Sequence, residues 1–179
     1  MDLDAQLRAV LKSQLHAALA TLRDVVERCP DDLWLAPGQP SAYWQVAYHT
    51  VFFGHLYLHP GLEQFVKWAG HQDAQHGDGL PGPADPASPL PLLPEPYTKA
   101  QVLAYCAVCD AMVDGAIDGL DVSRTECGFA WYSMSKLEHQ LVNLRHIQHH
   151  AAQLADRLRI ATGTGTRWVA QRPSPGASA

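Results

Sequence analysis

The chain has 179 residues, 47% of them hydrophobic, and a formal net charge of −5 at pH 7. This length and composition predict a single soluble globular domain over residues 1–179 with a full-sized core. The 13 Lys and Arg are outnumbered by 18 Asp and Glu and form no basic run, which argues against nucleic acid and membranes as partners. The expected partner is a small molecule or another protein.

The N-terminus and the cysteines favour a cytoplasmic location. The first ten residues, MDLDAQLRAV, lack the basic, then apolar, then small-residue order of a secretory signal. The most apolar run, residues 46–58, is too short to span a bilayer and predicts a buried helix. Cys106 and Cys109 form a C-x-x-C pair, but without the surroundings of a thioredoxin site or a zinc ribbon. We interpret them as ordinary thiols that line a helix.

Four helical segments are expected, and no segment has the pattern of a strand. The first runs from about Asp4 to Arg28, where apolar residues recur every three or four positions until a proline ends the pattern. A Pro- and Gly-rich connection follows at residues 35–40. Ser41 is then the expected N-cap of a second helix that reaches about His59.

Residues 69–97 are dense in Pro and Gly and show no periodicity. They predict a long irregular loop, which either covers a site or decorates one end of the fold. His71 and His76 lie in this loop and are interpreted as solvated. Thr98 is the expected N-cap of a third helix over residues 99–117.

The last helix begins with the capping-box signature formed by Ser135 and Glu138 and runs to about Thr162. The C-terminal tail, residues 163–179, follows it and offers Trp168 as an anchor. Four long helices, each with one apolar face, predict an all-α four-helix bundle.

Ten histidines in this length make two histidines four residues apart common by chance. His55 and His59 form one such pair, on the side of the second helix away from its apolar centre, and are interpreted as surface residues. His146 and His150 lie one turn apart inside the last helix, beside an apolar stripe, so their imidazoles can converge on one ion. His139, farther up this helix, is interpreted as a surface or supporting group.

A third candidate ligand is His49, in the middle of the apolar face formed by Val46, Phe52, Phe53 and Leu56. A histidine buried there would leave a polar nitrogen to be satisfied, and a metal shared with the late pair would satisfy it. The spacing leaves an alternative open, which is a hydrogen-bonded core histidine together with an exposed histidine cluster.

Other residues are candidates for the surroundings of such a site. His149 and Gln153 flank the late pair and are predicted to orient a ligand or a bound water. Phe53, Trp44 and Trp131 are candidates for the pocket wall, with packing in the core as the alternative for both tryptophans. No general base is evident.

Two segments, SAYWQVAYHTVFFGHLYL and NLRHIQHHAAQLADRLR, resemble the DinB/YfiT-like superfamily of metal-dependent four-helix bundles. The resemblance spans nearly the whole chain. In that family one histidine comes from the second helix, and two histidines one turn apart come from the last helix. The resemblance therefore implies His49, His146 and His150 as the metal ligands.

The chain departs from the family at Ile147, where relatives frequently carry an acidic residue, and at Ala152, where they often have Gly. Chemistry that needs this carboxylate is therefore not expected. Three imidazoles favour zinc or nickel over magnesium or calcium and leave at least one coordination position open.

The resemblance favours a metal-dependent transferase or isomerase that uses a low-molecular-weight thiol such as mycothiol or bacillithiol. One alternative is a metal-dependent hydrolase, in which the metal activates water. Another is a non-catalytic, metal-binding or stress-associated bundle. A homodimer is expected in each case, because helical bundles often pair through an exposed apolar helix face.

Overall fold

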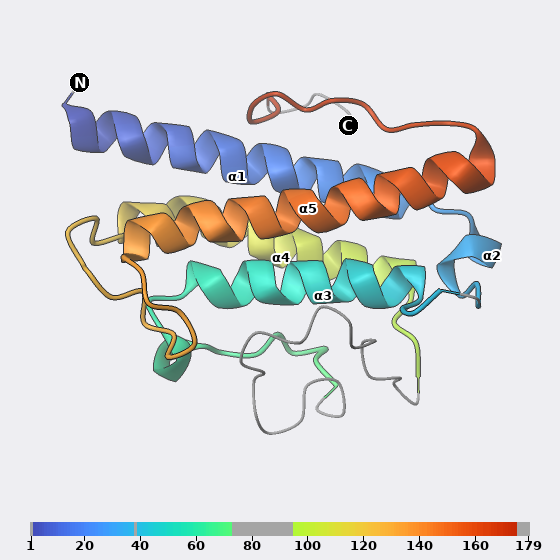
Figure 1. Ribbon diagram of the computed structural model, residues 1–179, viewed down its shortest axis with the longest axis horizontal. Helices are drawn as coiled ribbons and strands as arrows, with labels where there is room; N and C mark the ends of the chain where they lie inside the picture. The colour runs from blue at the N-terminus through green and yellow to red at the C-terminus, as the bar shows by residue number, and fades with distance from the viewer. Residues whose placement is uncertain (1, 38, 73–94, 175–179) are drawn as a thin grey trace.

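The structure, a computed structural model, describes residues 2–37, 39–72 and 95–174. These residues contain no strand, so the predicted all-α class is confirmed for them. The helices, labelled in Figure 1, are in chain order α1 (Leu3–Arg28), α2 (Asp31–Trp34), α3 (Tyr43–Leu58), the 3-10 turn η1 (Leu62–Gln64), α4 (Lys99–Asp118) and α5 (Lys136–Thr162).

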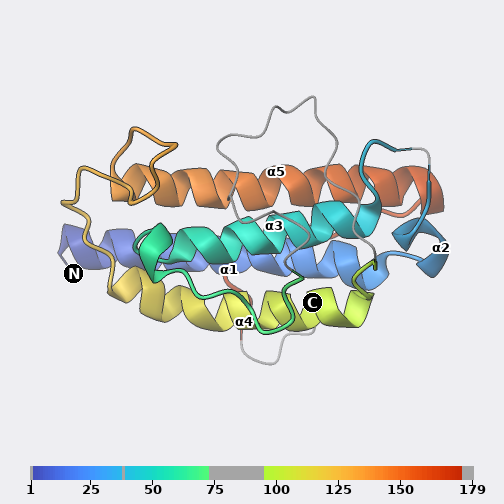
Figure 2. The same cartoon turned by 90° about the horizontal axis from the view of Figure 1, so that it is seen from below.

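The four long helices lie side by side as a bundle (Figures 1 and 2). α1 packs against α4 and α5, and α3 packs against the same two helices. α1 and α3 therefore occupy opposite corners of the bundle, and α5 is the neighbour of both. This places the histidine-bearing faces of α3 and α5 against each other.

The caps of α4 and α5 lie where the sequence predicts them. Oγ1 of Thr98 accepts a hydrogen bond from the backbone N–H of Gln101 at 3.2 Å, and Oγ of Ser135 accepts one from Glu138 at 3.1 Å. Each bond satisfies an N–H that the first helical turn leaves without a partner. α5 ends at Thr162, and the next residue, Gly163, has a φ of 71°, which is left-handed and favours glycine.

The start of α3 differs from the prediction. Ser41 is not its N-cap, because the helix begins one residue later, after Ala42. The backbone N–H of Ala42 donates to Oε1 of Gln45 at 2.8 Å. The short helix α2, which the sequence analysis did not predict, precedes this turn, and Nε1 of Trp34 donates to the carbonyl of Tyr97 at 2.8 Å.

α3 is enclosed on all sides, since every residue from Tyr43 to Leu58 except His49 is buried. α4 and α5 cover two sides of it. The chain that follows α3 covers another, because the rings of Phe65 and His71 pack on Phe52 with centroids 5.6 and 5.3 Å away. A helix that is apolar around its whole circumference needs such complete cover.

This cover corrects two predictions. His55 is only 3% exposed, so its interpretation as a surface residue is wrong, because residues 59–72 fold back along α3. His71 is not a solvated loop residue, because it is partly buried and its Nδ1 lies 2.6 Å from Oη of Tyr48. His76 lies outside the described residues.

The inner face of α4 carries Cys106 and Cys109, both buried and free, as expected of thiols that line a helix. Burial raises the pKa of Cys106 to about 12 and that of Cys109 well above its usual value. Among the described residues α4 is the one helix that is long and apolar enough to cross a membrane. The core helices of soluble proteins pass the same test, and α4 packs against α1 and α3.

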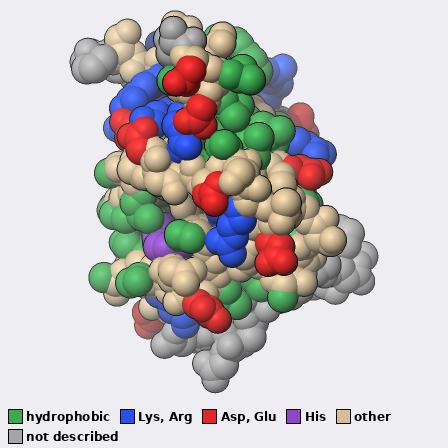
Figure 3. Space-filling view, turned by 90° about the vertical axis from the view of Figure 1, so that its left-hand side faces the viewer, with side chains coloured by type: hydrophobic (Ala, Val, Ile, Leu, Met, Phe, Trp, Pro, Cys, Tyr) green, Lys and Arg blue, Asp and Glu red, His purple; other side chains and the backbone are tan. Residues whose placement is uncertain are grey.

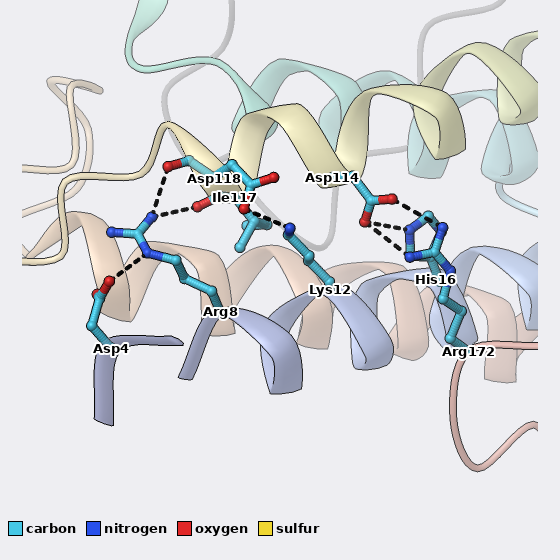
Figure 4. Close-up of polar contacts among 8 residues, drawn as sticks. All are labelled: Asp4, Arg8, Lys12, His16, Asp114, Ile117, Asp118 and Arg172. Atoms are coloured by element: carbon cyan, nitrogen blue, oxygen red, sulfur yellow. Dashed lines mark hydrogen bonds and ion pairs between the residues drawn. The ribbon is translucent and has the colours of Figure 1, made fainter. Parts of the chain in front are cut away.

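Polar contacts fix α1 against α4 (Figure 4). The guanidinium of Arg8 donates to the carbonyl of Ile117 at 2.6 Å. The two ring nitrogens of buried His16 contact Asp110 at 2.6 Å and Asp114 at 3.2 Å. Since the carboxylates are one turn apart on α4, these contacts fix the rotation of α4 relative to α1.

The chain after α5 turns back along α1 (Figure 1). Arg172 holds it there, because its guanidinium pairs with both oxygens of Asp114 at 3.0 Å (Figure 4). Its backbone N–H also donates to Oγ of Ser13 at 3.2 Å. Trp168 is 80% exposed, so its predicted anchoring role is wrong. The tail is held by polar groups.

Candidate metal centre

Three histidines from two helices meet between α3 and α5. One ring nitrogen from each of His49, His146 and His150 lies within 4.8 Å of the others. Nε2 of His146 is 3.3 Å from Nε2 of His49, and the ring centroids of His146 and His150 are 4.6 Å apart. The structure thus brings together the three residues that the sequence analysis selected, and we call them the triad.

The spacing of the triad suits a metal ion. Tetrahedral zinc with metal–nitrogen bonds of about 2.0–2.1 Å holds its ligand nitrogens roughly 3.3 Å apart. The separation of the His49 and His146 nitrogens equals this value. Within the described residues the triad is the one group of three or more His, Cys, Asp or Glu side chains that converges in this way.

Burial keeps two of these imidazoles neutral at pH 7. It lowers the pKa of His146 to about 3, with a smaller effect from His150, and it also lowers the pKa of His150. A neutral imidazole offers the lone pair that a metal needs. No proton therefore has to be displaced from these two rings before they bind a metal at neutral pH.

Gln153 fixes the tautomer of His150. Nδ1 of His150 lies 2.7 Å from Oε1 of Gln153, and an amide oxygen can only accept, so the proton sits on Nδ1. Nε2 is left unprotonated, which is how metal-binding histidines are commonly oriented. His149 is exposed, with its ring centroid 5.0 Å from that of His150, and so lies at the outer edge of the triad.

The triad is partly open to solvent and has an aromatic wall. His49 is the one residue of α3 that is not buried, so the enclosure of this helix is interrupted at the triad. Phe53, one turn later, places its ring centroid 4.7 Å from His49 and 5.7 Å from His146. An exogenous ligand here would meet three imidazoles and an apolar ring.

A comparison with known families covers this region. The profile of the DinB superfamily matches residues 14–154, a stretch that includes all of α3 and α4 and the whole triad. The chain belongs to the DinB superfamily. The predicted resemblance is thereby confirmed. Neither the curated proteins nor the solved structures contain a match to this DinB-superfamily chain.

The two tryptophans suggested for the pocket wall have packing contacts in this DinB-superfamily protein. Trp44 is buried and meets Tyr97 edge-on, with ring centroids 6.2 Å apart. Trp131 packs against Phe129 at 5.4 Å, in the loop that precedes α5. These contacts agree with the packing alternative.

His139 is fully buried, so its interpretation as a surface group is wrong. Its ring stacks on Phe129 with centroids 4.9 Å apart, lies 4.5 Å from Tyr57 and 5.5 Å from Tyr132. Burial lowers its pKa to about 3. The prediction failed because the loop before α5 folds over the first turns of that helix and supplies two of these rings.

Two buried amides, which the sequence analysis missed, set α5 against α3. Nε2 of Gln140 donates to the carbonyl of Tyr57 at 2.8 Å, and Nδ2 of Asn143 donates to that of Gly54 at 3.2 Å. Gly54 lets the helices approach closely, since a Cβ there would lie 3.3 Å from Ile147. Gln140, Asn143 and His146 are spaced three residues apart and so form a polar row along α5 that leads to the triad. This row was the sequence signal for the two buried amides.

Two cavities lie elsewhere on the DinB-superfamily bundle. One of about 140 Å³ is lined by residues of α2, the start of α3 and the end of α5, including Tyr43 and Arg157. The other, of about 580 Å³, lies between the turn after α3 and Arg124 and Gly128 of the loop before α5. Neither is lined by a triad histidine. Residues 73–94, most of the loop predicted either to cover a site or to decorate one end of the fold, lie outside the described residues.

Proposed function

We propose that this protein binds one divalent transition metal ion, zinc or nickel, through His49, His146 and His150. The observation that carries the proposal is the convergence of three imidazoles from α3 and α5, two of them 3.3 Å apart at Nε2. An all-nitrogen donor set favours zinc or nickel over magnesium or calcium, which prefer oxygen ligands. Membership of the DinB superfamily supports the same proposal.

Removing one ligand tests this directly. His146→Ala is expected to weaken the binding of zinc or nickel by more than about 100-fold, because two imidazoles hold an ion less completely than three. The measurement is calorimetric titration of untagged, chelator-treated protein, with elemental analysis of the product. The matched control is His149→Ala, which removes an exposed histidine of the same helix and should leave binding of one ion at the triad intact. Equal affinity in the wild type and His146→Ala would refute the assignment.

We further propose that the open coordination position takes a low-molecular-weight thiol, for transfer or isomerisation. A metal held by the triad would lower the pKa of such a thiol and stabilise the thiolate. The chain supports this with the solvent-accessible position of His49 and the apolar ring of Phe53. Ile147, buried beside the ligands, supplies no carboxylate for a reaction that needs one.

The thiol proposal predicts a spectroscopic change. Cobalt-loaded protein should gain a sulfur-to-cobalt charge-transfer band when cysteine, glutathione, mycothiol or bacillithiol is added, because the thiolate would enter the open position. His146→Ala, treated identically, should show no band. If the wild type gains no band with any of these thiols, the thiol proposal fails while metal binding by the triad stands.

A further inference from the structure

A second pair of imidazoles meets at the end of α3. Nε2 of His59 lies 3.3 Å from Nε2 of His55, the separation also found between His49 and His146. We propose that His55 and His59 form a second metal site, which takes one divalent ion of the imidazole-preferring class, such as nickel, copper or zinc. This inference does not depend on the function proposed for the triad.

The outer nitrogens of both rings have oxygen partners. Nδ1 of His55 lies 2.9 Å from the hydroxyl of Tyr105, which is buried, with its pKa raised by burial, and so remains a phenol. The backbone of Gln64 hydrogen-bonds the side chain of His59. Metal-binding histidines commonly donate their second N–H to such an oxygen. Without an ion, one Nε2–H donates to the other Nε2. A bound cation would replace that proton, and both rings would then carry their protons on the outer nitrogens and direct both Nε2 lone pairs at the ion.

The protonation state agrees with this geometry. Burial lowers the pKa of His55 to about 4, with a smaller effect from His59, and it also lowers the pKa of His59. Phe65 packs on both rings, with centroids 5.2 Å from His55 and 5.4 Å from His59, and restricts their motion. The pair is therefore positioned before an ion arrives, which reduces the entropy cost of binding.

The site is accessible to solvent at His59, which is only partly buried. The cavity of about 580 Å³ begins at the next residue, Pro60, and neither histidine of the pair lines it. Figure 3 shows that end of the bundle, where a histidine side chain reaches the surface and acidic and basic groups are mixed. Water or a small anion would complete the coordination. Lys136 donates to the carbonyl of His59, and its positive charge should make this site weaker than the triad.

The test separates the two sites. His146→Ala combined with His150→Ala removes two ligands of the triad, and nickel is then titrated calorimetrically into this chelator-treated protein. One equivalent should remain, and it should disappear when His59→Ala is added. Adding His149→Ala instead is the matched control and should leave this equivalent in place. Circular dichroism verifies that each variant is folded.

A second measurement covers the case in which the triad variant does not fold. In the otherwise unchanged protein, His59→Ala should lower the nickel stoichiometry by one ion, while His139→Phe, which removes a histidine that belongs to neither site, leaves it unchanged. If His59→Ala binds as many nickel ions as the wild type does, the contact between His55 and His59 is an ordinary hydrogen bond and the proposal is overturned.

Discussion

Acidification from pH 7.5 to pH 5.5 is expected to lower the free energy of unfolding of the metal-free protein by about 4 kcal/mol. Burial lowers the pKa of His55 to about 4 and those of His139 and His146 to about 3. In the unfolded chain a histidine has a pKa of about 6.5, so below this pH the unfolded state binds protons that the folded state does not. Stability is thus present above pH 6.5 and is lost as the pH falls toward 4, by about 1.4 kcal/mol per pH unit for each histidine.

Urea unfolding at the two pH values, with chelator present, measures this loss. The control is His139→Phe, since neither ring nitrogen of buried His139 has a hydrogen-bond partner among the described residues and the ring stacks on Phe129. Phenylalanine removes one titrating group without breaking a hydrogen bond, so this variant should lose only about 3 kcal/mol. A variant that loses as much as the wild type, or a wild type equally stable at both pH values, would contradict the assignment.

Gly128→Ala is expected to destabilise the protein by about 3 kcal/mol or more, because two penalties add. The φ of Gly128 is 87°, a left-handed conformation that alanine adopts at a cost. A Cβ there would also lie 2.3 Å from the carbonyl oxygen of Pro60 and 2.8 Å from Cα of Gly61. Both contacts are with backbone, so relief requires the loop before α5 to separate from the chain after α3. That separation would break the hydrogen bond from Leu62 N–H to the Gly128 carbonyl, 3.2 Å long.

Gly163→Ala separates the two penalties. Its φ of 71° is also left-handed, but an added Cβ would have no neighbour within 4 Å. This variant should therefore lose only about 1 kcal/mol, the conformational part alone. Chemical denaturation of the two variants beside the wild type provides the comparison. Similar losses for both would show that the contact with Pro60 is not as close as described.

Much of the fold follows from local patterns. Apolar residues repeating every three or four positions predicted α1, α4 and α5 to within about two residues of their observed ends. Thr98 and Ser135 could be recognised as caps because a cap bonds to an N–H only three residues away. The shared face of His146 and His150 follows in the same way, since residues four apart in a helix are neighbours.

The site needed more than local pattern. The pairing of His49 with the late histidines joins residues about a hundred positions apart, and the resemblance to a family was required to select it. The structure adds the reason that the helices meet in this register, which is the bonding of Gln140 and Asn143 to backbone carbonyls of α3. Helical periodicity shows which residues share a face, but not which face of another helix they contact.

The burial of three histidines depends on segments with no periodicity. His55 and His71 are covered or held by the chain after α3, and His139 by the loop before α5. Reasoning from helix faces therefore placed His55 and His139 at the surface, and the Pro- and Gly-rich composition placed His71 in solvent. The predicted anchoring role of Trp168 was wrong because the ion pair of Arg172 with Asp114 holds the tail. A sequence pattern reports the environment of a residue only where regular structure repeats. Irregular segments reach their positions through contacts between distant residues, and only the tertiary structure shows these contacts.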